Sequence, residues 1–200
     1  FLGWSPKSAD REILSLEEIS EIFDLSEINK AGAKFSWEKL NWINSQYIKN
    51  MESIKLIEIM RKYWDENGWE PPSQEWANKL AILIRDSMTL LKDSIDQSKP
   101  FFLIPTIQKE GQDFLENRES KLSLKLILNY LIEQNTIKLN KEKAKEIINE
   151  ISKKHNIKKG ILMKSLRVAF FGSLSGPDLI QSWELFAESK TDRTRIERCL

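Results

Sequence analysis

This sequence of 200 residues has few of the residues from which small chains build cross-links and metal sites. It contains one cysteine, Cys199, and one histidine, His155. A single cysteine excludes an internal disulfide, and a lone histidine excludes the usual zinc sites. No stretch approaches the roughly 18–20 consecutive apolar residues of a membrane span. We therefore expect no metal site and no membrane contact, and we expect a reducing compartment, the cytoplasm.

Signatures of catalysis are also missing. The sequence has no Gly-rich phosphate loop, no Gly-Lys-Ser/Thr and no Gly-x-Ser-x-Gly. Arginines near Cys199 could lower its pKa, but no histidine accompanies it, and His155 reads as a surface residue. We expect a binding module without catalytic residues or a cofactor. The first residue is phenylalanine rather than methionine, which suggests a fragment or a processed product.

Glycine and proline are scarce, with seven and six residues, and the prolines mark boundaries between apolar patterns of helical period. No alternating run is long enough to predict a sheet. The prediction is an all-α chain of about ten helices, arranged as helical bundles in two or three consecutive small domains.

Helix starts are readable from capping residues. A capping box begins at Ser15, Ser36 precedes a helix to about Met51, and Asn140 precedes a lysine-rich helix to His155. Gly172 ends a helix that begins at Lys159. Further helices are predicted at 53–64, 106–116 and 121–135, and after Thr191.

Two predicted helices depend on proline and serine positions. One begins after Ser73 and continues to Ile95, followed by an ordered connection between Pro100 and Pro105. The other has Ser175 as its cap and Pro177 at its first position, and it continues to Glu188.

Positive charge is concentrated in residues 121–167, which hold eleven lysines and one arginine against four glutamates, an excess of eight positive charges. Such a segment could bind a polyanion. The alternative is a solvated helical surface.

Two stretches resemble one family. They are Phe1–Pro6 followed by Ile28–Ile48, and Leu166–Leu179, which reads Leu-Arg-Val-Ala-Phe-Phe-Gly-Ser-Leu-Ser-Gly-Pro-Asp-Leu. Together they resemble, in order and approximate spacing, the C-terminal part of bacterial glutamyl-tRNA synthetases, a class I family. The resemblance implies a stem-contact domain at 1–52 and anticodon-binding helical domains at 53–120 and 121–200.

The family also implies a parent enzyme, a glutamate–tRNA ligase that attaches glutamate to tRNA-Glu. Its ATP and Mg belong to a Rossmann-type domain whose two signatures are missing here. The resemblance therefore implies a monomeric tRNA-binding fragment without catalytic activity of its own. A helical protein-interaction scaffold with no RNA role remains the alternative.

By resemblance, Arg167 hydrogen-bonds an anticodon base, and Gly176, Pro177 and Leu179 form the loop and helix start that receive the anticodon. A guanidinium is a planar, permanently charged fork that suits a base edge or a splayed base. Taken alone, Arg167 would be a surface charge, and Gly176-Pro177 an ordinary helix start.

One position departs from the family. Members specific for tRNA-Glu carry an arginine that reads the third anticodon base, and an ungapped alignment places Ser87 there. Serine cannot make the bidentate contact that distinguishes cytosine from guanine. We expect a parent that also charges tRNA-Gln, unless Arg85, two residues away, takes the role.

The stem-contact part offers polar candidates for contacts to the tRNA backbone: Lys39, Asn41, Asn44 and Lys49. A solvated helix face would look the same. The apolar residues nearby are expected in the core or at a domain interface: Trp37, Leu40, Trp42, Ile43 and Tyr47.

Overall fold

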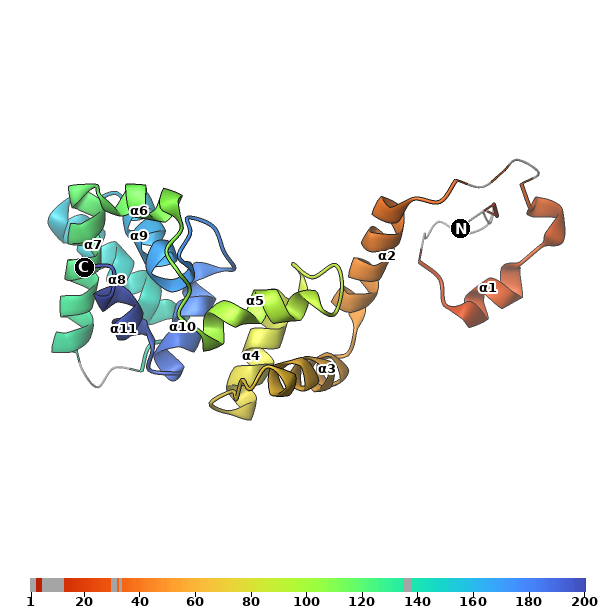
Figure 1. Ribbon diagram of the computed structural model, residues 1–200, viewed down its shortest axis with the longest axis horizontal. Helices are drawn as coiled ribbons and strands as arrows, with labels where there is room; N and C mark the ends of the chain where they lie inside the picture. The colour runs from red at the N-terminus through yellow and green to blue at the C-terminus, as the bar shows by residue number, and fades with distance from the viewer. Residues whose placement is uncertain (1–2, 5–12, 30–31, 33, 135–137) are drawn as a thin grey trace.

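A computed structural model describes residues 3–4, 13–29, 32, 34–134 and 138–200. In this part of the chain there are eleven α-helices, one 3-10 helix and an isolated antiparallel bridge between Trp4 and Ile28 (Figure 1). The prediction of an all-α fold is confirmed.

The N-terminal elements are α1 (Leu16–Ile22), the 3-10 helix η1 (Leu25–Glu27) and α2 (Trp37–Asn50). The capping box at Ser15 is present, because its hydroxyl accepts from the Glu18 N–H while Glu18 accepts from the Ser15 N–H. Ser36 caps α2 as predicted, through the N–H of Lys39. Figure 1 shows α1 and η1 beyond α2, at the end of the molecule farthest from the C-terminus.

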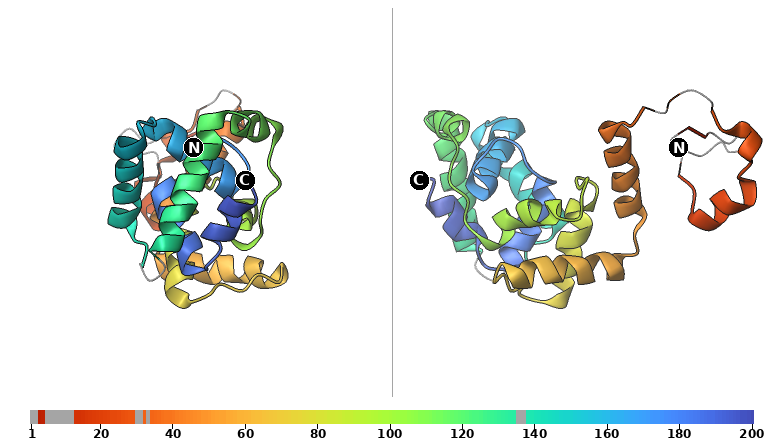
Figure 2. Two further views of the ribbon diagram at one scale, coloured as in Figure 1. Left: turned by 90° about the vertical axis from the view of Figure 1, so that its left-hand side faces the viewer. Right: turned by 45° about the vertical axis from the view of Figure 1, so that its right-hand side comes forward.

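A first helical lobe comprises α3 (Ser53–Glu66), α4 (Gln74–Arg85) and α5 (Asp93–Phe102). Its apolar faces meet around Met60, Leu80 and Ile84, which are fully buried. The indole Nε1 of Trp64 donates to the hydroxyl of Ser98 at 2.9 Å, so the one polar atom of that buried ring is satisfied. The lobe lies between α2 and the remaining helices (Figure 2).

The prediction of one helix from Ser73 to Ile95 is wrong. Ser73 caps the helix as expected, but α4 ends at Arg85 and a second helix, α5, begins at Asp93. Side chains compete with the helical ladder between them: the Ser87 hydroxyl donates to the Ile84 carbonyl, and Asp93 accepts from two backbone N–H groups. Met88 turns inward and is 1% exposed, which fixes the bend.

Pro100 lies inside α5, which ends two residues later, so the connection is shorter than predicted. Phe101 is helical and buried against the second lobe. A proline near the last turn removes only one backbone hydrogen bond, and the helix continues briefly past it.

The second helical lobe comprises six helices that pack around α9 and α7. They are α6 (Lys109–Leu115), α7 (Arg118–Glu133), α8 (Lys141–His155), α9 (Lys159–Phe171), α10 (Leu179–Glu188) and α11 (Asp192–Glu197). Asn140 caps α8 and Gly172 ends α9 in a left-handed conformation, both as predicted. The predicted boundary between residues 120 and 121 falls inside α7, and α6 packs against α7 and α9.

Helix α10 begins two residues later than predicted. Asp178, not Ser175, is its cap, and its carboxylate accepts from the N–H of Gln181 at 2.9 Å. Pro177 therefore precedes the helix instead of occupying its first position, and residues 173–178 form an open loop.

Candidate nucleic-acid interface

Arg167, on α9, holds the loop that leads into α10. Its Nη1 donates to the carbonyl oxygens of Gly176 and Pro177, at 3.0 and 3.1 Å. The structure thus brings together three residues that the sequence singled out for an anticodon site. Arg167 as a whole is half-buried.

The shape of this loop depends on glycine. Gly176 has φ 155°, and a Cβ there would lie 2.8 Å from the ring of Phe171. The backbone therefore packs directly on that ring, which only glycine permits. Leu179 is 1% exposed and lies in the core beneath the loop. Its side chain supports the loop in this conformation, and its direct contact with a base stays a prediction.

Arg85 and Ser87 stand at the carboxyl end of α4 and just beyond it. Ser87 is exposed, and its hydroxyl is used in the turn. Arg85 is half-buried; its Nε lies 3.9 Å from a carboxylate oxygen of Asp86 and has no hydrogen-bond partner in the described part of the chain. This Nε is itself buried, so a contact of Arg85 with RNA stays a prediction for its terminal nitrogens.

Two groups of candidate anticodon-reading residues, called the reader sets below, are Arg85 with Ser87 and Arg167 with Gly176 and Pro177. The packing of α4 on α10 connects the segments that carry them. Trp76 contacts Leu185, and Ile82 lines a cavity of about 350 Å³ together with Gln181. Numbers rise along α4 as they fall along α10, so the helices run antiparallel. The carboxyl end of α4, which carries Arg85, and the amino end of α10, which follows the loop with Gly176 and Pro177, therefore point the same way. Arg167 reaches that loop from α9.

The stem-contact candidates are arranged differently. Lys39 and Asn41 are exposed and Lys49 is half-buried, whereas Asn44 donates its amide hydrogen to the Thr89 carbonyl and so joins α2 to the bend after α4. Trp37 is 70% exposed, and Ile48 is the one buried residue of α2. The aromatic residues of α2 are not in a core here; their place at a domain interface stays a prediction.

The structure shows the surroundings of His155 and Cys199, the two residues considered above for catalysis or metal binding. His155 is exposed at the end of α8, as predicted. Cys199 is buried, and burial raises the pKa of its thiol more than the nearby Arg198 lowers it, so the suggestion of a lowered pKa is wrong. Among the described residues, no group of three or more His, Cys, Asp or Glu could hold a metal ion, and no helix could cross a membrane.

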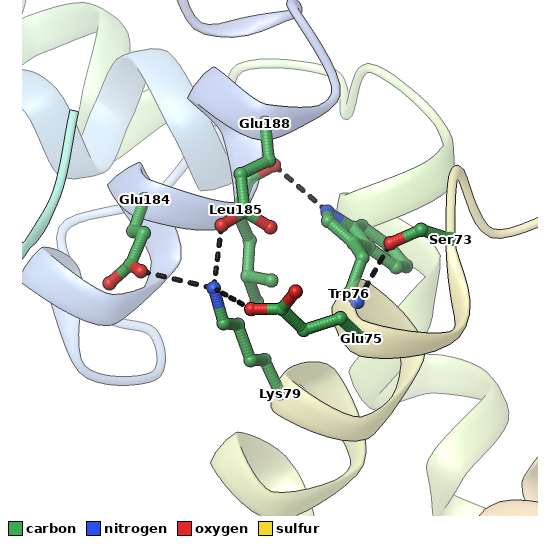
Figure 3. Close-up of polar contacts among 7 residues, drawn as sticks. All are labelled: Ser73, Glu75, Trp76, Lys79, Glu184, Leu185 and Glu188. Atoms are coloured by element: carbon green, nitrogen blue, oxygen red, sulfur yellow. Dashed lines mark hydrogen bonds and ion pairs between the residues drawn. The ribbon is translucent and has the colours of Figure 1, made fainter. Parts of the chain in front are cut away.

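Sequence reasoning missed the ion pairs between the lobes. Lys79 of α4 donates to carboxylates of Glu184 and Glu188 on α10, at 3.2 and 2.6 Å (Figure 3). A signal was present, because two acids four residues apart on one helix repel each other unless a cation lies near both.

Sequence reasoning also missed the buried Arg195. Its guanidinium is 1% exposed, lies 4.3 Å from the centroid of the Phe186 ring, and donates to the carbonyls of Phe170 and Leu103. Burial lowers the pKa of this arginine to about 10. The Phe170 carbonyl, at the end of α9, offsets part of this charge, since a helix carboxyl end is negative.

Comparison with known proteins found a matching family and similar sequences. The family described as "Anticodon binding domain" matches residues 55–200. A glutamate–tRNA ligase of one Prochlorococcus marinus strain is 98% identical over the whole chain, and that of another strain is 46% identical over 199 residues. In both, this chain spans 42% of the relative's length.

Solved structures resemble the chain along its length. A glutamate tRNA ligase from Elizabethkingia meningosepticum, solved in complex with its amino acid, superposes with a TM-score of 0.90 and 29% identity. A glutamate-tRNA synthetase from Elizabethkingia anophelis gives 0.86 and 30%. Each comparison covers 99% of this chain and 38% of the other.

Proposed function

Because this chain belongs to the anticodon binding domain family, we propose that it binds the anticodon loop of a tRNA across the ends of α4 and α10. The observation that carries the proposal is the pair of hydrogen bonds from Arg167 to the carbonyls of Gly176 and Pro177. They hold a permanent cation beside an open loop. An unstacked base can hydrogen-bond or stack on a guanidinium in such a place.

The tRNA bound is tRNA-Glu, and we extend the proposal to tRNA-Gln. Ser87 stands where an arginine would read the third anticodon base, and its hydroxyl already donates within the turn. The serine side chain is short and its hydroxyl proton is already used in a hydrogen bond, so it provides no bidentate contact to guanine or cytosine. Arg85 is two residues from Ser87. In this proposal it binds the phosphates or the third base without distinguishing cytosine from guanine.

The parent protein, in this proposal, is a cytoplasmic glutamate–tRNA ligase that acts as a monomer. The chain spans 42% of its relatives' length, so glutamate activation with ATP and Mg is assigned to the rest of the protein. Binding of the stem by Lys39, Asn41 and Lys49 of α2 completes the tRNA contact. Asn44 contributes by holding α2 against the first lobe.

The test is fluorescence anisotropy with labelled tRNA-Glu and a transcript whose anticodon is replaced. We expect tighter binding of the matched transcript and affinity that falls with salt. Arg167→Ala should weaken the matched complex by about 10-fold or more, the cost of about 1–3 kcal/mol for a lost base contact. Arg167→Lys should recover only part of the lost affinity, because an ammonium lacks the planar, paired N–H donors of a guanidinium.

The matched control is Lys62→Ala, which removes one exposed positive charge from α3. It should lower affinity for both transcripts slightly and equally. Equal affinity of the unmodified chain for both transcripts, or equal loss in the Arg167 and Lys62 variants, would point to nonspecific binding and to the scaffold role instead.

A further inference from the structure

The two lobes meet where α4 packs on α10. One lysine, Lys79, lies among glutamates there, and buried aromatic rings pack beside it. The Lys79 ammonium reaches Glu75 at 3.2 Å on its own helix, and Glu184 and Glu188 on α10 (Figure 3). The hydrogen bond to Glu188 is the largest influence and raises the pKa of Lys79, so the cation persists at physiological pH. The side chains of Glu184 and Glu188 are 16% and 22% exposed, which limits screening by water.

Beside the ion pairs, the indole Nε1 of Trp76 donates to the Leu185 carbonyl at 2.9 Å, in a buried position. The rings of Phe101 and Phe186 are stacked with centroids 5.0 Å apart. Apolar stacking resists separation of the lobes but permits sliding, because it has little directionality. The hydrogen bond of Trp76 and the contacts of Lys79 with Glu184 and Glu188 are directional, and together they restrict how far α4 slides and rotates on α10.

Arg85 lies at the carboxyl end of α4, and the loop with Gly176 and Pro177, which Arg167 on α9 holds, leads into the amino end of α10. Arg85 lies six positions after Lys79 on α4, about 9 Å along the helix axis, and Leu179, the first residue of α10, lies five positions before Glu184, about 8 Å along that axis. A small rotation at the contact becomes a displacement of one set relative to the other. Bases held by both sets sense that displacement, since hydrogen bonds weaken steeply with distance and angle.

We propose that Lys79 is a positioning residue for anticodon recognition: through Glu184 and Glu188 it sets the spacing between the Arg85–Ser87 set and the Arg167–Gly176–Pro177 set. It contacts no RNA itself. The inference rests on the proposed function, and it predicts that Lys79 governs discrimination between anticodons and contributes little to affinity for RNA in general.

The first experiment needs no RNA. Spin labels at Asp86→Cys and Ser175→Cys, both exposed, report the distance between the sets in a Cys199→Ala background. We expect a narrow distance distribution for the unmodified contact and a broad or shifted one for Lys79→Met. Lys79→Arg should restore the narrow distribution because it keeps the charge. Glu75→Gln is the matched control: it removes a partner of Lys79 that lies on α4 itself and is 78% exposed, so the distribution should not change.

The second experiment measures the ratio of the dissociation constants for the anticodon-replaced and matched transcripts, with unlabelled full chains. Lys79→Met should lower this ratio by about 5-fold, the lower range of coupling between sites, while affinity for the replaced transcript stays constant. Lys79→Arg and Glu75→Gln should keep the original ratio. A circular dichroism melt confirms that each variant is folded.

An unchanged ratio in Lys79→Met would overturn the inference and leave the proposed function intact. An equal loss for both transcripts would also overturn it, because Lys79 would then be an ordinary phosphate contact. An unmodified chain that does not discriminate at all would contradict the proposed function itself, and with it the inference.

Discussion

The backbone of Gly172 lies directly against the backbone of Thr106. A Cβ at Gly172 would be 2.2 Å from the Thr106 carbonyl oxygen, and the Gly172 carbonyl accepts from the N–H of Gln108 at 2.8 Å. The end of α9 and the connection that leaves the first lobe are therefore held together at a point where no side chain fits. This contact stands at the root of the loop that carries Gly176 and Pro177.

Replacing Gly172 with alanine should destabilise the fold by about 3 kcal/mol or more. The left-handed φ of 70° costs roughly 1–2 kcal/mol for a residue with a Cβ, and displacing the Thr106 backbone adds a comparable amount. Urea unfolding followed by circular dichroism measures the change. Gly160→Ala is the control, because nothing lies within 4 Å of its Cβ position; there we expect a gain of about 0.5 kcal/mol.

Arg195→Met should cost about 3 kcal/mol, although methionine fills a similar volume. The substitution leaves the buried carbonyls of Phe170 and Leu103 without a donor, at roughly 1–3 kcal/mol each. Equilibrium unfolding of the full chain checks this. A destabilisation below about 1 kcal/mol would mean that water or a neighbour replaces the guanidinium.

The stability of the chain should carry a pH dependence from Asp192. This carboxyl is 7% exposed and lines a cavity of about 690 Å³, and burial raises its pKa from the ordinary value of 3.8. A raised folded-state pKa means that the folded state holds the proton more tightly than the unfolded state. The contribution of Asp192 to stability is thus fully present below 3.8 and is lost as pH rises through the folded-state pKa.

Asp192→Asn isolates this effect, because asparagine does not titrate. The free energy of unfolding of the unmodified chain, minus that of the variant, should increase between about pH 7 and about pH 4. A difference that stays constant would mean that the pKa of Asp192 is the same in the folded and unfolded states, and one that decreases on acidification would show that the folded state stabilises the carboxylate.

Ser87→Arg should introduce discrimination at the third anticodon base. The longer side chain restores a guanidinium that can contact a base edge with two hydrogen bonds, worth about 1–3 kcal/mol against the wrong base. Competition binding of tRNA-Glu and tRNA-Gln measures the preference. Ser87→Lys is the charge-matched control and should raise affinity for both without separating them.

If the unmodified chain already prefers tRNA-Glu, the effect of Arg85→Ala decides the reason. Loss of the preference would assign the reading role to Arg85. Retention of the preference would exclude Arg85 from third-base recognition.

Much of the fold could be predicted because its signals are local. The caps at Ser15, Ser36 and Asn140 are each satisfied by a backbone N–H within three residues, so the sequence alone contains both partners. The α4–α5 bend could not be predicted in this way. It depends on Met88 entering the core and on Asp93 turning back to the preceding backbone, which compete with a helical pattern that continues through them.

Some residues of the candidate site could be predicted from the sequence, and others could not. Arg167, Gly176 and Pro177 were found because a resemblance aligned them, and the structure adds that the arginine binds the loop through two carbonyls. Lys79 and Arg195 were not found, because their partners are about 90 to 109 residues away in the sequence or are backbone carbonyls that no side-chain pattern reveals.

By itself, then, the sequence determined where most helices begin and end, that the chain is all-α, and which residues are candidates for RNA contact. Period, caps and glycine positions act over a few residues, where chain connectivity keeps the partners close. Only the tertiary structure decided that α4 runs antiparallel to α10, that Lys79 joins the lobes, and that Leu179 lies beneath the loop rather than in it. Those outcomes depend on which apolar faces meet, and many pairings satisfy the same periodicity until the whole core is packed at once.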